Sequence, residues 1–200
     1  MDREGPVRGI GGLSRAELEA GRDLLLPDVL SEGLPVVFCG LNPGLTSAVR
    51  GHHFASPGNR FWPALARSGF TPGRYSPDRD GTLPELGMGF TNLVARATRG
   101  ADELEPEEFV RGAEELRRKV LELRPGWLAF LGITGYRAGF GDRRAKVGPQ
   151  ETTIGGTRLW VLPNPSGRNA HWTPEGLAEE FGRLRAAAGL PDRPLPTGRS

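Results

Sequence analysis

Four short apolar runs punctuate the chain and predict the strands of a buried sheet. The runs are 35–41 (PVVFCGL), 89–94 (GFTNLV), 127–132 (WLAFLG) and 157–163 (TRLWVLP). Because apolar and polar residues do not alternate through most of these runs, they are typical of strands covered on both faces. Such strands need a layer of helices on each side of the sheet.

Three other segments have the pattern of helices. Ser14 and Glu17 form a capping-box signature for a short helix that would stop before Pro27. A second helix is predicted after Pro106, where apolar side chains recur at helical spacing: Phe109, Ala113, Leu116, Val120 and Leu123. A third is predicted after Thr173, with Leu177, Phe181, Leu184 and Ala188 in the same pattern. The expected fold is an α/β protein, a three-layer α/β/α sandwich with a short, mainly parallel central sheet.

Length and composition fit one globular domain. The 200 residues are 37% hydrophobic, which is enough to form a sizeable core. We expect a single domain over 14–188. Gly and Pro are frequent in the ends, so we expect 1–13 to be a flexible N-terminus and 189–200 a flexible tail.

Charge and cysteine usage exclude several classes of protein. A formal net charge of +2 does not by itself indicate a nucleic-acid partner. The single cysteine, Cys39, excludes an internal disulfide and a cysteine-rich metal site. No run approaches the ~18 apolar residues of a membrane span, and the first residues lack the order of a secretory signal. We therefore expect a cytoplasmic protein without a membrane partner, associated with the nucleoid if the source is a bacterium. The sequence carries no signal for the oligomeric state, and a monomer is the default expectation.

Two similar loops follow the first and the last of the predicted strands. They read GLNPG at 40–44 and PNPSG at 163–167. In an open α/β sheet, ligands bind beyond the carboxyl ends of the strands, so both loops should face one site. Pro43 and Pro165 restrict the preceding Asn42 and Asn164 to extended conformations, which fixes the direction of their amides. Each loop alone would also suit an ordinary turn, and it is the pair that indicates a site.

Longer blocks give this pattern a specific resemblance. The stretch GLNPGLTSAVRGHHFASPGNRFWPAL, followed in order by GFTNLV, LAFLG and LPNPSG, resembles the mismatch-specific uracil-DNA glycosylase and thymine-DNA glycosylase family. The likeness runs from about Val36 to about Phe181. It implies a uracil-DNA glycosylase-like fold and a DNA repair enzyme that needs no cofactor. Its partner would be double-stranded DNA containing G·U or G·T mismatches, from which it would flip out uracil, with thymine and damaged pyrimidines as further candidates, and hydrolyse the N-glycosidic bond.

The resemblance also implies roles for individual residues. Asn42 would hold the hydrolytic water, and Phe54 would stack on the flipped base, although Phe54 also fits an ordinary core position. The other residues expected at the base are Leu41, Ser47 and Asn92. The second loop, through Asn164, Ser166, Gly167 and Arg168, would bind DNA and wedge into the gap left by the extruded nucleotide; a solvated surface arginine is the alternative for Arg168.

Two further features bear on a metal site and on the catalytic activity. His52 and His53 are adjacent, but no cysteine or carboxylate stands at ligand spacing, so we expect no metal. The family commonly has an acidic residue where this chain has Ala95. A catalytically weak or inactive protein that binds mismatched or abasic DNA is therefore an alternative. A nucleotide-processing α/β enzyme is a third, although no Walker or dinucleotide motif supports it.

Overall fold

A five-stranded sheet forms the centre of the computed structural model, which describes residues 12–193 and 195. Its strands are β1 (Val36–Gly40), β2 (Met88–Asn92), β3 (Trp127–Leu131), β4 (Gly148–Ile154) and β5 (Thr157–Leu162). They are ordered β2-β1-β3-β5-β4. The first four in this order are parallel, and β4 alone runs antiparallel to its neighbour β5.

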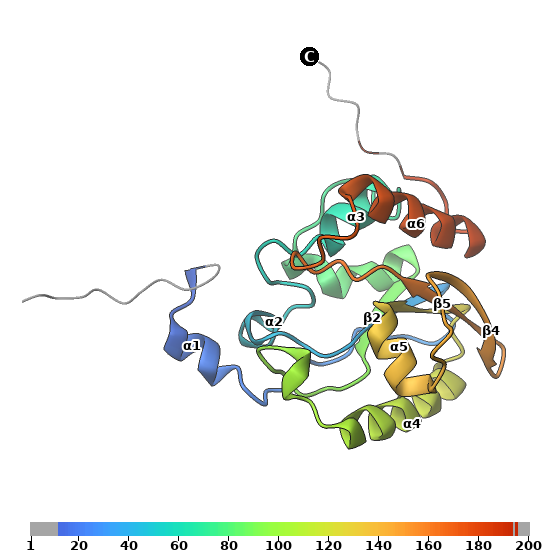
Figure 1. Cartoon of the computed structure of the whole chain (residues 1–200). Helices are drawn as coiled ribbons and strands as arrows, with labels where there is room; N and C mark the ends of the chain where they lie inside the picture. Colours follow the sequence, from blue (N-terminus) through green and yellow to red (C-terminus); the bar gives the residue numbers. More distant parts are fainter. Residues whose placement is uncertain (1–11, 194, 196–200) are drawn as a thin grey trace, which may run out of the picture.

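Helices cover both faces of the sheet (Figure 1). One layer holds α3 (Phe61–Arg67), α6 (Pro174–Ala187) and the 3-10 helix η2 (Pro77–Leu86), and the other holds α4 (Pro106–Leu123) and α5 (Ile133–Phe140). Successive side chains of a strand point to opposite faces of the sheet. In β1, Phe38 packs with Phe61 and Phe181, whereas Val37 lies in the cluster with Leu116. These two buried clusters confirm the predicted α/β/α sandwich.

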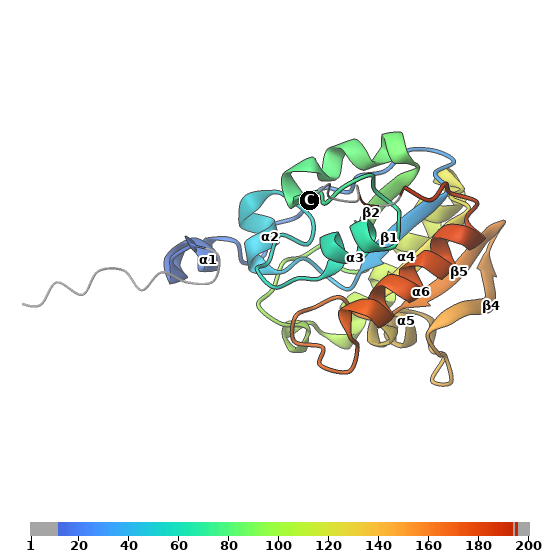
Figure 2. The ribbon, with the colours of Figure 1, turned by 90° about the horizontal axis from the view of Figure 1, so that it is seen from above.

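The remaining helices gather at one end of the molecule. Figure 2 shows α1 (Arg15–Ala20) beside α2 (Leu45–Arg50), which begins just after β1. A small apolar cluster of Leu45, Ala48 and Ala97 joins them, with Leu18 packed against it. The 3-10 helix η3 (Ala101–Glu103) completes the set. None of the helices in 12–193 and 195 combines the length and the apolarity that a membrane span requires.

The predicted elements are present, and the structure adds others. The four apolar runs are β1, β2, β3 and β5, and the helices expected after Pro106 and Thr173 are α4 and α6. The helix that Ser14 caps is α1, which ends at Ala20 with Gly21 as its C-cap, well before the expected stop at Pro27. Among the elements that the sequence pattern did not indicate are β4 and α5. The side chains of β4 are mostly exposed, so this strand lacks the apolar run that marks a buried one.

The two outer strands of the sheet, β4 and β2, are each interrupted or partly covered. On the β4 side, the pairing with β5 shifts register between Pro149 and Thr153. On the β2 side, Val29 forms an isolated antiparallel bridge with Phe90, and its N–H and C=O both bond to Phe90 at 2.9 and 2.8 Å.

The expected division of the chain stays a prediction, although part of the expected tail contacts the domain. The backbone N–H of Arg193 donates to Gly69 O at 2.9 Å, and its guanidinium donates to Phe70 O at 3.1 Å. Leu190 packs against the core. Of the expected flexible ends, residues 1–11, 194 and 196–200 lie outside the described residues.

Candidate functional site

The loops singled out in the sequence lie at the carboxyl ends of the parallel strands, which all point the same way. The loop after β1 is 41–44, the loop after β2 is 93–99 and the loop after β5 is 163–173. Two glycines that follow β3 pack closely against the first and the last of these loops. A Cβ on Gly135 would lie 3.0 Å from Leu41 Cδ1, and one on Gly132 would lie 3.2 Å from Asn164 Cβ. The two Asn-Pro loops therefore flank the end of β3.

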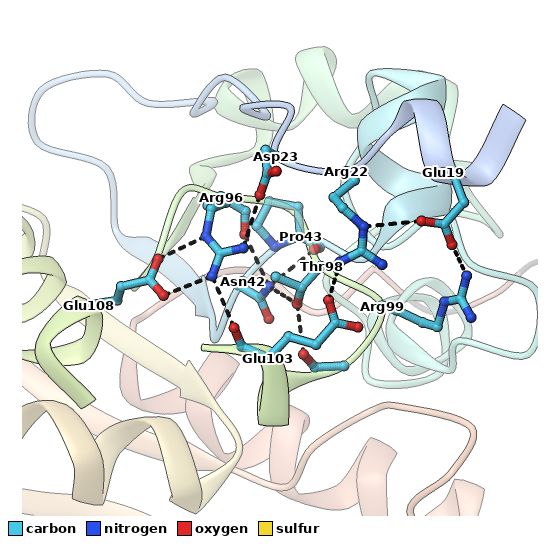
Figure 3. Close-up of polar contacts among 11 residues, drawn as sticks. Glu19, Arg22, Asp23, Asn42, Pro43, Arg96, Thr98, Arg99, Glu103 and Glu108 are labelled. Carbon is cyan, nitrogen blue, oxygen red and sulfur yellow. Dashed lines mark hydrogen bonds and ion pairs between the residues drawn. The ribbon is translucent and has the colours of Figure 1, made fainter. Parts of the chain in front are cut away.

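The amide of Asn42 is held in one orientation (Figure 3). Its Nδ2 donates to Thr98 Oγ1 at 2.7 Å and to Arg96 O at 3.1 Å, with a longer contact to Pro43 O at 3.4 Å. Thr98 Oγ1 donates its own hydrogen to Gly100 O at 2.8 Å, so it faces Asn42 as an acceptor. An amide nitrogen only donates, so these acceptors fix which end of the amide is the nitrogen. Oδ1 accepts no hydrogen bond from residues 12–193 or 195 and is available to a water molecule or a ligand.

An ion-pair network supports the loop that holds Asn42. Arg96 donates to both carboxylate oxygens of Glu108 at 2.9 and 2.8 Å, to Asp23 at 2.9 Å and to Glu103 O at 3.0 Å. The Arg96 guanidinium lowers the pKa of Glu108 to about 2, and Glu108 raises the pKa of Arg96. The network ties the loop after β2 to α4 and to the segment after α1, so it fixes the carbonyl to which Asn42 donates.

Phe54 occupies a strained turn in the loop between α2 and α3. Its φ is +55°, which is a left-handed conformation unusual for an aromatic residue. The amides on either side are held by side chains: His53 N donates to Asp80 Oδ2 at 2.8 Å, and Ala55 N donates to Ser47 Oγ at 3.0 Å. These two bonds keep the turn in a conformation that the local backbone disfavours.

The Phe54 ring and Asn92 meet at the end of β1. The half-buried ring lies 4.1 Å, centroid to centroid, from the buried ring of Phe61. A Cβ on Gly40 would lie 2.5 Å from Asn92 Oδ1 and 3.7 Å from Phe54 Cε1, so glycine permits this approach. Asn92 is 9% exposed, and its side chain makes no hydrogen bond to the residues that the structure describes. The structure thus brings Asn42, Phe54 and Asn92 to the same end of β1 and β2.

The other two residues expected at the base lie further back. Ser47 is buried, and its hydroxyl accepts from Ala55 N behind the Phe54 turn. The side chain of Leu41 packs with the α4 and α5 cluster, on the opposite face of the sheet from Phe54. Because the side chain points to that layer, the backbone of Leu41 is the part of this residue that remains next to Asn42.

The adjacent histidines point in different directions. His53 is 2% exposed, and its Nε2 lies 3.0 Å from Pro27 O, whereas His52 Nδ1 lies 3.2 Å from Asp80 Oδ1. Burial lowers the pKa of His53, which keeps the imidazole neutral. Within 12–193 and 195, no group of three or more His, Cys, Asp and Glu side chains is arranged to hold a metal ion.

The second loop is preformed by its own side chains. Asn164 Oδ1 accepts from Ser166 N at 2.9 Å, and Ser166 Oγ accepts from Arg168 N at 3.3 Å. Gly167 packs against the loop between α2 and α3, where a Cβ on Gly167 would lie only 2.7 Å from Gly58 O. The Arg168 side chain is exposed and makes no hydrogen bond or ion pair with any residue that the structure describes. The loop therefore presents a guanidinium to solvent from a fixed backbone.

Sequence reasoning missed three residues that hold these loops: Arg60, Asp80 and Thr98. Arg60 stands inside the block GNRFWPAL, and Thr98 stands in VARATRG, so both lie within or beside segments that carry the resemblance. Their partners are 106 to 112 and 56 residues away, respectively. Asp80 lies in a polar segment with no comparable signal.

A comparison with protein families agrees with this arrangement. The family model of the uracil DNA glycosylase superfamily matches residues 27–185, a range that contains every site residue expected from the sequence. Members of this class are glycosidic hydrolases of DNA base-excision repair. With most of its length matched, the chain belongs to the uracil DNA glycosylase superfamily.

Proposed function

We propose that this protein excises uracil from mismatched duplex DNA, with G·U as the first substrate and G·T as the second. The observation that carries the proposal is the orientation of Asn42, whose nitrogen is bound within the protein and whose Oδ1 is left unpartnered by the described residues. An amide oxygen accepts a hydrogen bond from water but takes up no proton at neutral pH. Asn42 would therefore orient the attacking water without acting as a base.

The chemistry proposed for this site is slow. General-base assistance contributes roughly 10²- to 10⁴-fold to a rate, and Asn42 does not supply it. The rate would come from expulsion of the base, which leaves the sugar with oxocarbenium-like character. N–H groups that stabilise the departing pyrimidine anion would assist this step. We expect poor turnover for this reason.

The base would be held by Phe54 and Asn92. Stacking on an aromatic ring contributes about 1–3 kcal/mol per base, and the Phe54 ring is fixed by its strained turn and by Phe61. The Asn92 amide, without a partner in the described part of the chain, has both a donor and an acceptor for the edge of the pyrimidine. Ser47 and the backbone of Leu41 would complete this side.

The second loop would enter the duplex. Mispaired bases are the least costly to extrude, and Arg168, carried by the Asn164–Ser166–Gly167 turn, would fill the gap that the nucleotide leaves. A guanidinium can stack, donate to the orphaned base and attract phosphate.

One observation favours a second candidate function. Ala95 is exposed at the position where an acid was expected, and no carboxylate of the described residues bonds to Asn42. The nearby acids Glu108 and Asp23 are paired with Arg96. A protein that binds mismatched or abasic DNA with weak or no catalysis is the alternative.

The test is single-turnover cleavage of a G·U duplex by the wild type and by Asn42→Ala. We expect the wild type to generate alkali-labile strands and N42A to generate none above background, with both proteins folded at the assay temperature, as cooperative thermal melting shows. Wild-type rates in N42A would rule out the assignment. A wild type that shifts G·U or abasic duplexes in a gel without forming alkali-labile strands would support the alternative.

A further inference from the structure

Arg60 lies where the Phe54 loop, 51–60, meets the Arg168 loop, 163–173. Its backbone N–H donates to Pro165 O at 2.9 Å. Its guanidinium donates to three more carbonyls of the same loop: Ser166 O at 3.1 Å, Asn169 O at 2.6 Å and Trp172 O at 2.6 Å. One residue thus binds four points along eight residues of the second loop.

The Arg60 guanidinium is directed into the protein. Its Nε is buried and has no hydrogen-bond partner in 12–193 or 195. No carboxylate among those residues lies within ion-pair distance of it, so backbone carbonyls are its partners. A planar fork of donors can reach several carbonyls at once, whereas a lysine ammonium is a single point of charge. The arrangement therefore requires arginine.

A second contact joins the same two loops. A Cβ on Gly167 would lie 2.7 Å from Gly58 O and 3.2 Å from Gly58 C, so the two backbones are already in contact at these glycines. Gly58 lies between Phe54 and Arg60 in the first loop. With the contact at Gly167 and the four bonds of Arg60, the loop that carries the stacking ring and the loop that carries Arg168 form one unit.

We infer that Arg60 is a positioning residue that holds the Arg168 loop in the shape that enters the duplex and couples it to the Phe54 loop. Displacement of the base and its capture would then occur together. The roles of the two loops on DNA rest on the proposed function, whereas the tie between them rests on the contacts alone.

The tie is tested by amide hydrogen exchange of the free protein. In Arg60→Lys, the amides of Arg168, Asn169 and His171 should exchange at least about tenfold faster, because charge-assisted bonds to carbonyls are lost. The rates are compared with those of β3 amides in the same variant, so that a general loss of stability cancels. Unchanged exchange in the loop would overturn the inference.

Arg67→Lys is the matched control. Arg67 is the last residue of α3, the helix that Arg60 directly precedes, and its exposed side chain pairs with Glu175 at 3.2 Å. Both arginines line a cavity of about 130 Å³ between α3 and α6. R67K should leave the exchange of the second loop unchanged. An equal effect of R67K would assign the change to the cavity and contradict a specific role of Arg60.

A duplex with 2-aminopurine next to the uracil measures the coupling on DNA. R60K should lower both the fluorescence change of base extrusion and the single-turnover rate about tenfold. The salt dependence of binding should keep its slope, because the Arg60 guanidinium binds protein carbonyls and not phosphate. A smaller slope, or unchanged extrusion, would overturn the inference. If the wild type excises nothing while the exchange result holds, the proposed function fails and the tie between the loops stands.

Discussion

At the scale of single residues, Thr98 decides which way the Asn42 amide faces. Its hydroxyl gives its hydrogen to Gly100 O and offers a lone pair to Asn42 Nδ2. Thr98 is 1% exposed, so water does not readily replace its hydroxyl. If the hydroxyl is removed, the carbonyls of Arg96 and Pro43 alone hold the amide, and it can turn.

Thr98→Val should therefore lower the single-turnover excision rate roughly tenfold, since a net hydrogen bond contributes about 0.5–1.5 kcal/mol. Thr98→Ser keeps the hydroxyl and should stay near the wild-type rate. Single-turnover assays on a G·U duplex, with thermal melting of each variant, make the comparison. Equal rates in T98V and T98S would show that Asn42 does not depend on this bond.

At the scale of elements, two helix glycines differ in what lies beside them. A Cβ on Gly112 of α4 would lie 2.1 Å from Leu93 O, just beyond the end of β2, whereas one on Gly182 of α6 would lie 3.9 Å from Ser68 O. The helix α4 thus approaches the loop that leads to Arg96 more closely than any side chain would allow. Replacing Gly by Ala inside a helix favours the helix by about 1 kcal/mol when there is room.

Replacing glycine by alanine should therefore change the free energy of unfolding in opposite directions in the two helices. Gly182→Ala should raise the free energy of unfolding by up to about 1 kcal/mol, and Gly112→Ala should lower it by more than about 1 kcal/mol because α4 must move outward. Urea unfolding at neutral pH, with equal slopes in all three proteins, gives both values. Stabilisation by G112A would show that α4 can shift without loss of packing.

The elements also show how far sequence reasoning reached. The strands β1, β2, β3 and β5 were predictable because burial on both faces makes them continuously apolar, and α4 and α6 because an apolar stripe and a first-turn proline mark them. The edge strand β4 was not, because most of its side chains are exposed. The helix α5 is short and contains two glycines, Gly135 and Gly139, which weaken a helical pattern.

The candidate site divides in the same way. Asn42 and Phe54 stand within the first block of the family resemblance, and Arg168 directly follows its last block, LPNPSG, so they could be proposed from the sequence. Arg60 and Asp80 act through carbonyl and amide groups that are distant along the chain, and no local pattern reports such contacts. The strain at Phe54 was equally hidden, because a positive φ at an aromatic residue has no sequence signature.

At the scale of the whole molecule, His53 links folding to pH. The unfolded chain binds the proton with the ordinary pKa of 6.5, whereas burial lowers the pKa of His53 in the folded protein. Below 6.5 the unfolded state therefore binds more protons than the folded state, and the free energy of unfolding falls as the pH decreases toward the folded pKa. Above 6.5 this contribution is fully present.

His53→Gln should flatten this part of the pH profile, since glutamine does not titrate and can donate its amide to Pro27 O. Urea unfolding midpoints of both proteins, measured at intervals from neutral to mildly acidic pH, check the expectation. The same slope in the wild type and in H53Q would show that His53 is not the group responsible.

The borders of the sheet bear on how the protein behaves at high concentration. An unbroken outer strand offers a row of free backbone groups to which a second chain can add, and this is a common start of aggregation. Here the shifted register near Pro149 interrupts one border, and Val29 already occupies the backbone groups of Phe90 at the other. Extension of the sheet from one molecule to the next is thus hindered at both borders, which lowers the tendency of the folded protein to aggregate through its sheet.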